Sequence, residues 1–302
     1  MYVRGYQGST LSWAISSVVV AVVFVSVLTG RWPWDLADEI WGPGRRFSEQ
    51  DAALMRAAQQ GDDAGVRQAL AAGARVNALR PEDRLTPLIV AAQASEPVVL
   101  NTLLAAGADH TIIGGTNVTA LDEAVAHGSP EAVRALIAVK PNLSRAGGER
   151  EWTPLARAIH RYVDASPAPR QPGNPEELRT ALQIVDDLLG AGADPSLGEA
   201  GPAGDSPLAL AAFRGLDRIA TRLLAAGADA KGVRASTGDT ILGAAVQACS
   251  PGTPAVVRAL LAHGADPDAR GPGGQSARDR RAAQASTSEA CQSVLTALAA
   301  AF

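Results

Sequence analysis

The chain has 302 residues, of which 47% are hydrophobic and only 4% are aromatic. Its 27 basic and 31 acidic side chains give a formal net charge of −4, which excludes nucleic-acid binding through a general basic surface. Two cysteines, Cys249 and Cys291, are too few for a disulfide scaffold or a four-thiolate zinc site. The abundant alanine, glycine and leucine indicate small, closely stacked helices.

Residues 11–29 form an uncharged apolar segment. As a helix they would span about 28 Å, close to the ~30 Å hydrocarbon core of a bilayer. Tryptophans, whose indoles favour the membrane interface, flank both ends at Trp13, Trp32, Trp34 and Trp41. The sequence therefore predicts an N-terminal tail (1–10), a single transmembrane helix (11–29) and a linker (30–50).

A cleaved signal peptide is the alternative interpretation of this segment. Its apolar run is longer than the usual ~7–15 residues, and Leu28-Thr29-Gly30 lacks the small residue that a cleavage site requires. We therefore expect an uncleaved anchor.

The orientation of the anchor stays open. The basic residues that follow it, Arg31, Arg45 and Arg46, outnumber Arg4 before it, which favours a cytoplasmic C-terminal part. Short N-terminal anchors, however, commonly export the domain on their C-terminal side. Because the arginine-rich, lysine-poor composition is typical of a GC-rich bacterial genome, we expect a single-pass protein of a bacterial inner membrane. We favour a periplasmic over a cytoplasmic repeat domain.

Residues 51–302 consist of one repeated sequence pattern. Apolar runs end in Gly-Ala-Asp clusters at residues 107–109, 192–194, 227–229 and 264–266, and each cluster is followed by a polar turn and a new helix start. These starts are Ala52, Thr86, Thr119, Thr153, Ser206, Thr240 and Ser276. They lie 33 to 36 residues apart, with one interval of 53. The pattern predicts about seven units of one architecture.

The chemistry of each unit predicts helix, short loop, helix and finger-like turn. Thr or Ser before Pro-Leu, as at Thr86-Pro87-Leu88, is an N-cap followed by proline at the first helical position. Apolar residues such as Val99 and Leu103 form one stripe of a second helix. The glycine after it permits the positive φ of a helix end.

This pattern resembles the ankyrin repeat, whose ~33-residue unit carries T-P-L-H-x-A. The resemblance implies an all-α ankyrin-repeat solenoid over residues 51–302, with a capping unit at Gln275–Phe302. The histidine of the motif is replaced throughout, by Ile89, Asp122, Ala156, Ala209 and Gly243. We therefore expect the loop hydrogen bonds of that histidine to be lost.

The long interval indicates an insertion in the fourth unit, near residues 163–175, between its two helices. Its prolines, Pro167, Pro169, Pro172 and Pro175, forbid a continuous helix. The loop is either a decoration, which we favour, or a contact for a specific partner.

No catalytic or metal-binding motif is present. The four histidines, His110, His127, His160 and His263, fall in four different units without metal-ligand spacing. The glycine-rich stretches lack the phosphate-loop pattern. Cys249 and Cys291 occupy different positions in their units, so we expect free thiols rather than a bridge. The chain is expected not to be an enzyme, and to take no cofactor, metal or small-molecule substrate.

The resemblance places a concave groove along the first helices and the finger turns. The residues seven and eight positions after each helix start are expected to face it. We predict a protein-binding surface of Gln93, His127, Trp152, His160, Arg161, Phe213, Arg214 and Gln247. Trp152 precedes Thr153 on a finger, and tryptophan and arginine are enriched in binding hot spots. An alternative is that Trp152 packs under the insertion.

The predicted function is a membrane-tethered module that binds a partner protein on its concave face. The alternative is a stoichiometric regulator that stabilises or inhibits an envelope enzyme or toxin. That ankyrin folds bind rather than catalyse is an analogy within the family.

Overall fold

The computed structural model describes residues 47–165, 174–198, 204–248, 252–272, 274–283 and 289–299. The predicted transmembrane helix, residues 11–29, lies outside these residues, as does most of the linker. No helix in the described ranges is both long and apolar enough to cross a membrane. Almost all of the described helical structure belongs to one compact part of the chain, Gln50–Phe302, which we call the repeat domain.

Helices follow one another in pairs along the repeat domain. The first helices of the pairs are α3 (Glu49–Gln60), α5 (Pro87–Gln93), α7 (Ala120–His127), α9 (Pro154–Ala165), α11 (Pro207–Arg214), α13 (Ile241–Ala248) and α15 (Ala277–Ala283). The second helices are α4 (Asp63–Ala71), α6 (Pro97–Ala105), α8 (Pro130–Ile137), α10 (Pro175–Gly190), α12 (Asp217–Ala225), α14 (Thr253–Ala262) and α16 (Glu289–Ala299). The expected all-α architecture is confirmed.

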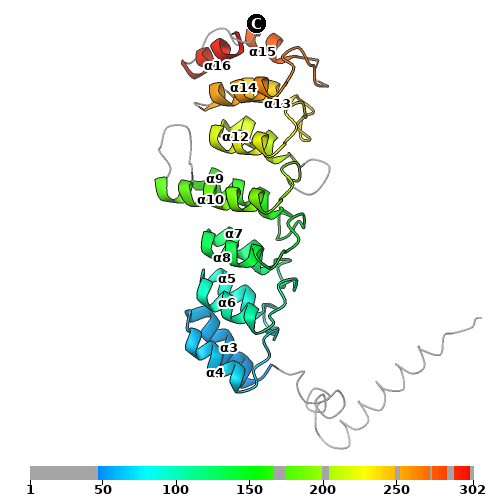
Figure 1. The fold of residues 1–302 in the computed structure, drawn as a ribbon. Coiled ribbons are helices and arrows are strands. Elements are labelled where there is room, and N and C mark those ends of the chain that lie inside the picture. Colours follow the sequence, from blue (N-terminus) through cyan, green and yellow to red (C-terminus); the bar gives the residue numbers. More distant parts are fainter. Residues whose placement is uncertain are drawn as a thin grey trace, which may run out of the picture. The chain divides into compact units, whose positions relative to one another are not determined.

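The pairs stack in chain order (Figure 1). From α5 to α15 each first helix packs against the next first helix, and from α4 to α16 each second helix packs against the next second helix. The core between them is thin. It consists of leucines such as Leu88 and Leu208 and of alanine pairs such as Ala91–Ala92 and Ala211–Ala212, all at most 1% exposed. Small side chains let neighbouring helices approach closely, which explains how a chain with few aromatics builds a core.

Hydroxyl caps start the first helices as the sequence predicted. The side chains of Thr86, Thr119 and Ser206 accept hydrogen bonds from the backbone N–H three residues later. Thr153 and Thr240 make the same bond, to Ala156 and Gly243. These bonds satisfy backbone donors that have no partner inside the helix.

Left-handed residues end the second helices. Gly107 has φ +88° and Gly227 has φ +95°, each directly after the C-terminal cap of its helix. In the third unit Lys140, two residues after the cap Ala138, makes the equivalent backbone hydrogen bond, to the carbonyl three residues earlier, with φ +55°. A side chain costs about 1–2 kcal/mol in this conformation, so the third unit is strained where the others carry glycine.

Aspartate–arginine pairs tie the start of a helix pair to the turn or helix that follows the pair. The fully buried Asp51 accepts hydrogen bonds from the backbone N–H and the guanidinium of Arg75, at 2.8 and 2.6 Å. Asp205 accepts from Arg234 at 2.6 Å. Asp239 pairs in the same way with Arg280. Arg75 and Arg234 lie in the finger turns after α4 and α12, and Arg280 lies in α15, so each bond spans one complete helix pair.

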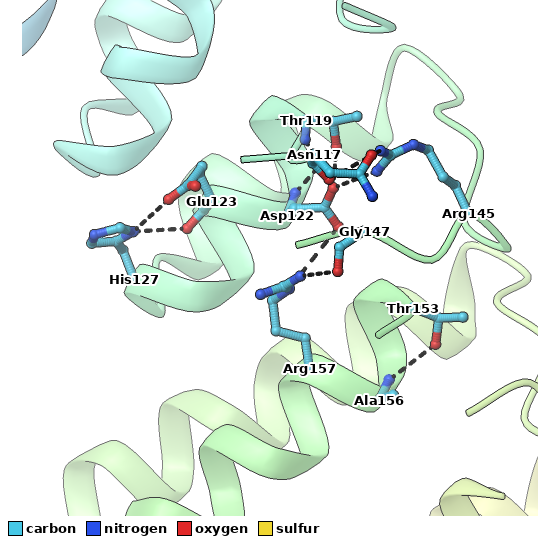
Figure 2. Close-up of polar contacts among 10 residues, drawn as sticks. All are labelled: Asn117, Thr119, Asp122, Glu123, His127, Arg145, Gly147, Thr153, Ala156 and Arg157. Atoms are coloured by element: carbon cyan, nitrogen blue, oxygen red, sulfur yellow. Dashed lines mark hydrogen bonds and ion pairs between the residues drawn. The ribbon is translucent and has the colours of Figure 1, made fainter. Parts of the chain in front are cut away.

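The expected loss of loop hydrogen bonds is wrong at Asp122, which stands in the place of the motif's histidine (Figure 2). Its carboxylate accepts from the backbone N–H and the hydroxyl of Thr119, at 2.8 and 2.9 Å. It also accepts from Arg145 Nη1 at 3.0 Å, and Arg145 reaches on to the Asn117 carbonyl. The carboxylate therefore replaces the imidazole, because an arginine is available in the next turn.

In the fourth unit the insertion lies between α9, with 12 residues, and α10, with 16 residues the longest helix of the described chain. The helix α9 runs to Ala165, into the range predicted as a loop, and α10 starts at Pro175, capped by Asn174. Part of the inserted length therefore extends the helix pair, as Figure 1 shows. The segment 166–173 lies outside the described residues.

Candidate protein-binding surface

Trp152 is held in a small hairpin of the finger turn before α9. Its backbone N–H donates to the Gly147 carbonyl at 3.1 Å, and its own carbonyl accepts from the Gly147 N–H at 3.0 Å. The next residue, Thr153, is the cap of α9. The backbone therefore fixes Trp152 between two structured elements, although it lies in a turn.

The Trp152 ring stacks on the imidazole of His160, with ring centroids 3.7 Å apart and planes within 4° of parallel. The Arg150 guanidinium lies over the indole, 4.9 Å from the ring centroid. Such a contact between a cation and an aromatic face stabilises both groups. The three side chains thus form a layered stack that joins the finger to α9, and Trp152 remains half-exposed in it.

The side chain of Arg161, which belongs to α9, lies against the C-terminal end of the neighbouring helix α7. Its Nη1 donates to the Ala126 carbonyl at 2.7 Å, where the helix dipole favours a positive charge. The guanidinium covers Gly128, the left-handed cap of α7 with φ +71°, where an added Cβ would lie 2.3 Å from Arg161 Nε. This predicted surface residue therefore also packs one unit on the next.

Phe213 and Arg214 end helix α11, just before its glycine cap. The Arg234 guanidinium lies 4.2 Å from the Phe213 ring centroid and is itself held by Asp205. Phe213 stays half-buried, and Arg214 is exposed. A second aromatic–arginine contact is thus built from the end of α11 and the finger turn that follows α12.

The structure places these residues on consecutive units, since α9 packs against α11. We call the set of Arg150, Trp152, His160, Arg161, Phe213 and Arg214 the central patch. The surface predicted from the sequence included neither Arg150 nor Arg234. The sequence signal for Arg234 would have been an arginine in the finger turn of the same unit whose first helix ends in the aromatic Phe213.

The other predicted residues lie at the ends of three different first helices. Exposed His127 contacts its own helix, with Nδ1 3.0 Å from the Glu123 carbonyl (Figure 2). Gln247 accepts a hydrogen bond from Arg280 at 2.6 Å, and Gln93 is half-buried at the end of α5. None of the described contacts brings these three into the central patch.

A hollow of about 290 Å³ lies beside Trp152, between two finger turns. It is lined by Thr116, Val118, Gly148, Glu149, Arg150, Trp152 and Arg157. Arg157 donates from Nη2 to the Gly147 carbonyl at 2.8 Å, while its buried Nε has no hydrogen-bond partner in the described structure. The nearest carboxylate oxygen, Asp122 Oδ1, is 4.0 Å from that Nε. The hollow is therefore a polar recess with two guanidinium groups in its wall.

The described residues contain no group of three or more side chains placed to hold a metal ion. Cys249 lies outside the described residues, and so does the side chain of Cys291. The expectation of free thiols stays a prediction.

Comparison with known proteins agrees with the repeat architecture. A family model of ankyrin repeats in three copies matches residues 54–146 and 178–271, more than half of the chain. The ankyrin repeat domain of human ASB11 matches with a TM-score of 0.58 and 23% identity, covering 81% of this chain and 96% of its own. That of Bcl-3, titled a unique member of the IkappaB protein family, matches with a TM-score of 0.64 and 22% identity, covering 83% and 100%.

At these identities the two structures show a shared fold alone. The comparison with curated proteins found no match. The family model and the stacked, capped helix pairs together show that the chain belongs to the ankyrin-repeat family, whose repeats are generic protein–protein interaction modules.

Proposed function

We propose that the chain binds a partner protein through the central patch and acts as a binding module rather than as an enzyme. The observation that carries this proposal is the layered stack of Arg150, Trp152 and His160. A half-exposed tryptophan held rigidly on a finger turn loses little conformational entropy on binding, which favours affinity. Tryptophan and arginine are also the residue types most enriched in hot spots.

The test is comparative affinity purification of the tagged full chain from its native host. Trp152→Ala should lower the recovery of the partner at least tenfold, because truncating a hot-spot residue costs about 2 kcal/mol or more. Leu79→Ala is the matched control, since Leu79 is an apolar residue on the finger turn after α4 and is 38% exposed. Circular dichroism should show that both variants stay folded. A folded Trp152→Ala chain that recovers the same proteins in the same amounts would refute the proposal.

We further propose that residues 11–29 tether this module to a bacterial inner membrane. Support comes from the sequence of the segment, its uncharged length and its flanking tryptophans. The linker 30–50 would then keep capture of the partner close to the bilayer. We favour export of the repeats, and the basic residues after the segment argue for the opposite orientation.

Fusions to Phe302 separate these orientations. Active alkaline phosphatase together with a dark fluorescent protein indicates a periplasmic repeat domain, and the reverse result indicates a cytoplasmic one. Recovery of the full chain in the soluble fraction after lysis without detergent would contradict the tether. The partner's activity, measured with and without co-expression of this chain, separates simple capture from stoichiometric regulation.

A further inference from the structure

Most arginines of the described structure are already neutralised within the chain. Pairs such as Arg75–Asp51, Arg145–Asp122 and Arg234–Asp205 place guanidinium and carboxylate groups within 3.0 Å of each other. Lysine is almost absent, with only Lys140 and Lys231 in the whole sequence. Arginine is the better partner for such pairs because its planar fork matches a carboxylate.

Three arginines of the central patch are exceptions. Arg150, Arg161 and Arg214 take part in none of the ion pairs found among the described residues. The same holds for four arginines scattered over other elements, Arg56, Arg84, Arg218 and Arg258. The central patch is therefore the place where unneutralised guanidinium groups gather around exposed aromatic surface.

The hollow beside Trp152 brings Arg157, which lies 4.0 Å from the buried Asp122 carboxylate, next to the unpaired Arg150. Two guanidinium groups, of Arg150 and Arg157, line it against one carboxylate, that of the exposed Glu149. Arg157 Nε is buried without a hydrogen bond. Because that nitrogen is closed off from solvent, an acceptor that enters the hollow would meet the other atoms of the Arg157 side chain and the Arg150 guanidinium, whose positive charges favour an anionic group. Carboxylates and phosphates both match a guanidinium group, and a carboxylate is the acceptor that an unmodified protein partner presents on its own side chains.

We propose that the partner presents an acidic segment to the central patch, with one carboxylate side chain in the hollow between Arg150 and Arg157. Further acidic residues pair with Arg214, and an apolar side chain covers Trp152 and Phe213. This inference rests on the proposed function and specifies the chemistry of the partner. Because the whole chain carries a net charge of −4, long-range attraction does not steer an acidic partner, and local pairing acts mainly by slowing dissociation.

The test is selection of random dodecapeptides displayed on phage against the immobilised full chain. Three proteins are compared: the unmodified chain, the patch variant Arg150→Gln with Arg214→Gln, and the control variant Arg56→Gln with Arg258→Gln. The control removes the same number of charges from exposed sites on α3 and α14. The unmodified and control chains should enrich acidic peptides that contain an aromatic or aliphatic residue. The patch variant should lose this enrichment.

The enriched peptide, labelled with a fluorophore, then allows affinities to be compared by anisotropy. Its Kd should rise at least tenfold for the patch variant and less than twofold for the control, and replacing its Glu by Gln should weaken binding to the unmodified chain similarly. Neutral or basic peptides, the absence of any enrichment, or acidic enrichment that persists with the patch variant would overturn the inference.

A parallel selection against Trp152→Ala distinguishes the two proposals. If non-acidic peptides bind the unmodified chain and are lost with Trp152→Ala, the central patch is the binding surface and only the acidic partner is refuted. If Trp152→Ala selects the same peptides as the unmodified chain, the proposed function fails as well.

Discussion

The indole of Trp152 and the imidazole of His160 lie parallel and in contact, 3.7 Å apart, although one belongs to a finger turn and the other to a helix. The contact fixes the tryptophan before any partner arrives. A partner therefore meets an ordered aromatic surface, and the entropy cost of immobilising Trp152 has been met in folding.

The stack should be measurable as a coupling energy between its two rings. In a double-mutant cycle of Trp152→Ala and His160→Ala, we expect a coupling of about 0.5–1.5 kcal/mol in the free energy of urea unfolding. Trp152→Ala with Gln93→Ala serves as the control pair, because the described contacts do not join Gln93 to the patch, and its effects should add. Additive effects of Trp152→Ala and His160→Ala would show that the rings do not support each other in solution.

Asp122 should be among the most sensitive polar positions of the third unit. Its carboxylate is 2% exposed and bonded to Thr119 and Arg145. Asp122→Ala removes a capping acceptor and leaves Arg145 without its carboxylate, so we expect a loss of about 3 kcal/mol in the free energy of unfolding. Glu131→Ala, which removes an exposed ion pair with Arg134, should cost less than about 1 kcal/mol. Equal effects at the two positions would contradict the structural role of Asp122.

Local chemistry explains how much the sequence could predict. The caps at Thr86 and Ser206 and the glycine at Gly107 depend on a few neighbouring residues, so their positions revealed the repeat. The hydrogen bonds of Asp122 were not predicted because its partner Arg145 lies 23 residues away. The motif alone shows only that its histidine is replaced. For the candidate surface, the sequence predicted which residues belong to it but not how their side chains contact one another. The sequence could not reveal that Trp152 stacks on His160 or that Arg161 caps another helix, because both contacts depend on how successive elements pack.

Lys140 offers a site for stabilisation. Its φ of +55° and the bond from its N–H to the Ile137 carbonyl, at 2.9 Å, match the role of glycine in the other units. Lys140→Gly should therefore raise the free energy of urea unfolding by about 1 kcal/mol, through relief of left-handed strain. At the neighbouring helical cap, Ala138→Gly should have the opposite effect, about 0.5–1 kcal/mol of destabilisation. Lys140→Gly that destabilises as Ala138→Gly does would show that no strain is stored there.

Asp187 should make stability depend on pH in an unusual direction. Burial raises the pKa of its carboxyl and outweighs the attraction of Arg134, whose Nε is 3.9 Å away. Because the folded chain then binds this proton more tightly than the unfolded chain does, the ionised group opposes folding above the raised pKa, and its penalty fades as pH falls through that pKa.

Asp187→Asn should therefore raise the free energy of unfolding at pH 7, by less than about 1 kcal/mol because the site is partly exposed. The gain should shrink on acidification and disappear below the ordinary carboxyl pKa of about 3.9. Thermal unfolding at several pH values tests this, with Asp186→Asn as the control because Asp186 pairs with Arg222 at 2.5 Å and should give no gain. A gain that does not vary with pH would argue against an effect of the carboxyl charge.

The aspartate–arginine pairs also determine which parts of the chain are interchangeable. A breakpoint between Asp51 and Arg75, or between Asp122 and Arg145, would strand a buried charge at a cost of about 3–5 kcal/mol, so each of these helix pairs can be transplanted only together with the finger turn that follows it. In the fourth unit, Trp152 occupies the position directly before the helix start, which Asp51, Asp205 and Asp239 occupy in other units. The junction of the fourth and fifth units therefore lacks an aspartate–arginine pair of this kind. Thr153 bonds there to the carbonyls of Leu197 and Gly198. Because peptide carbonyls are present in any sequence, recombination at this junction would break, among the ion pairs of the described residues, only the partly exposed Arg222–Asp186 pair, while exchanging half of the central patch.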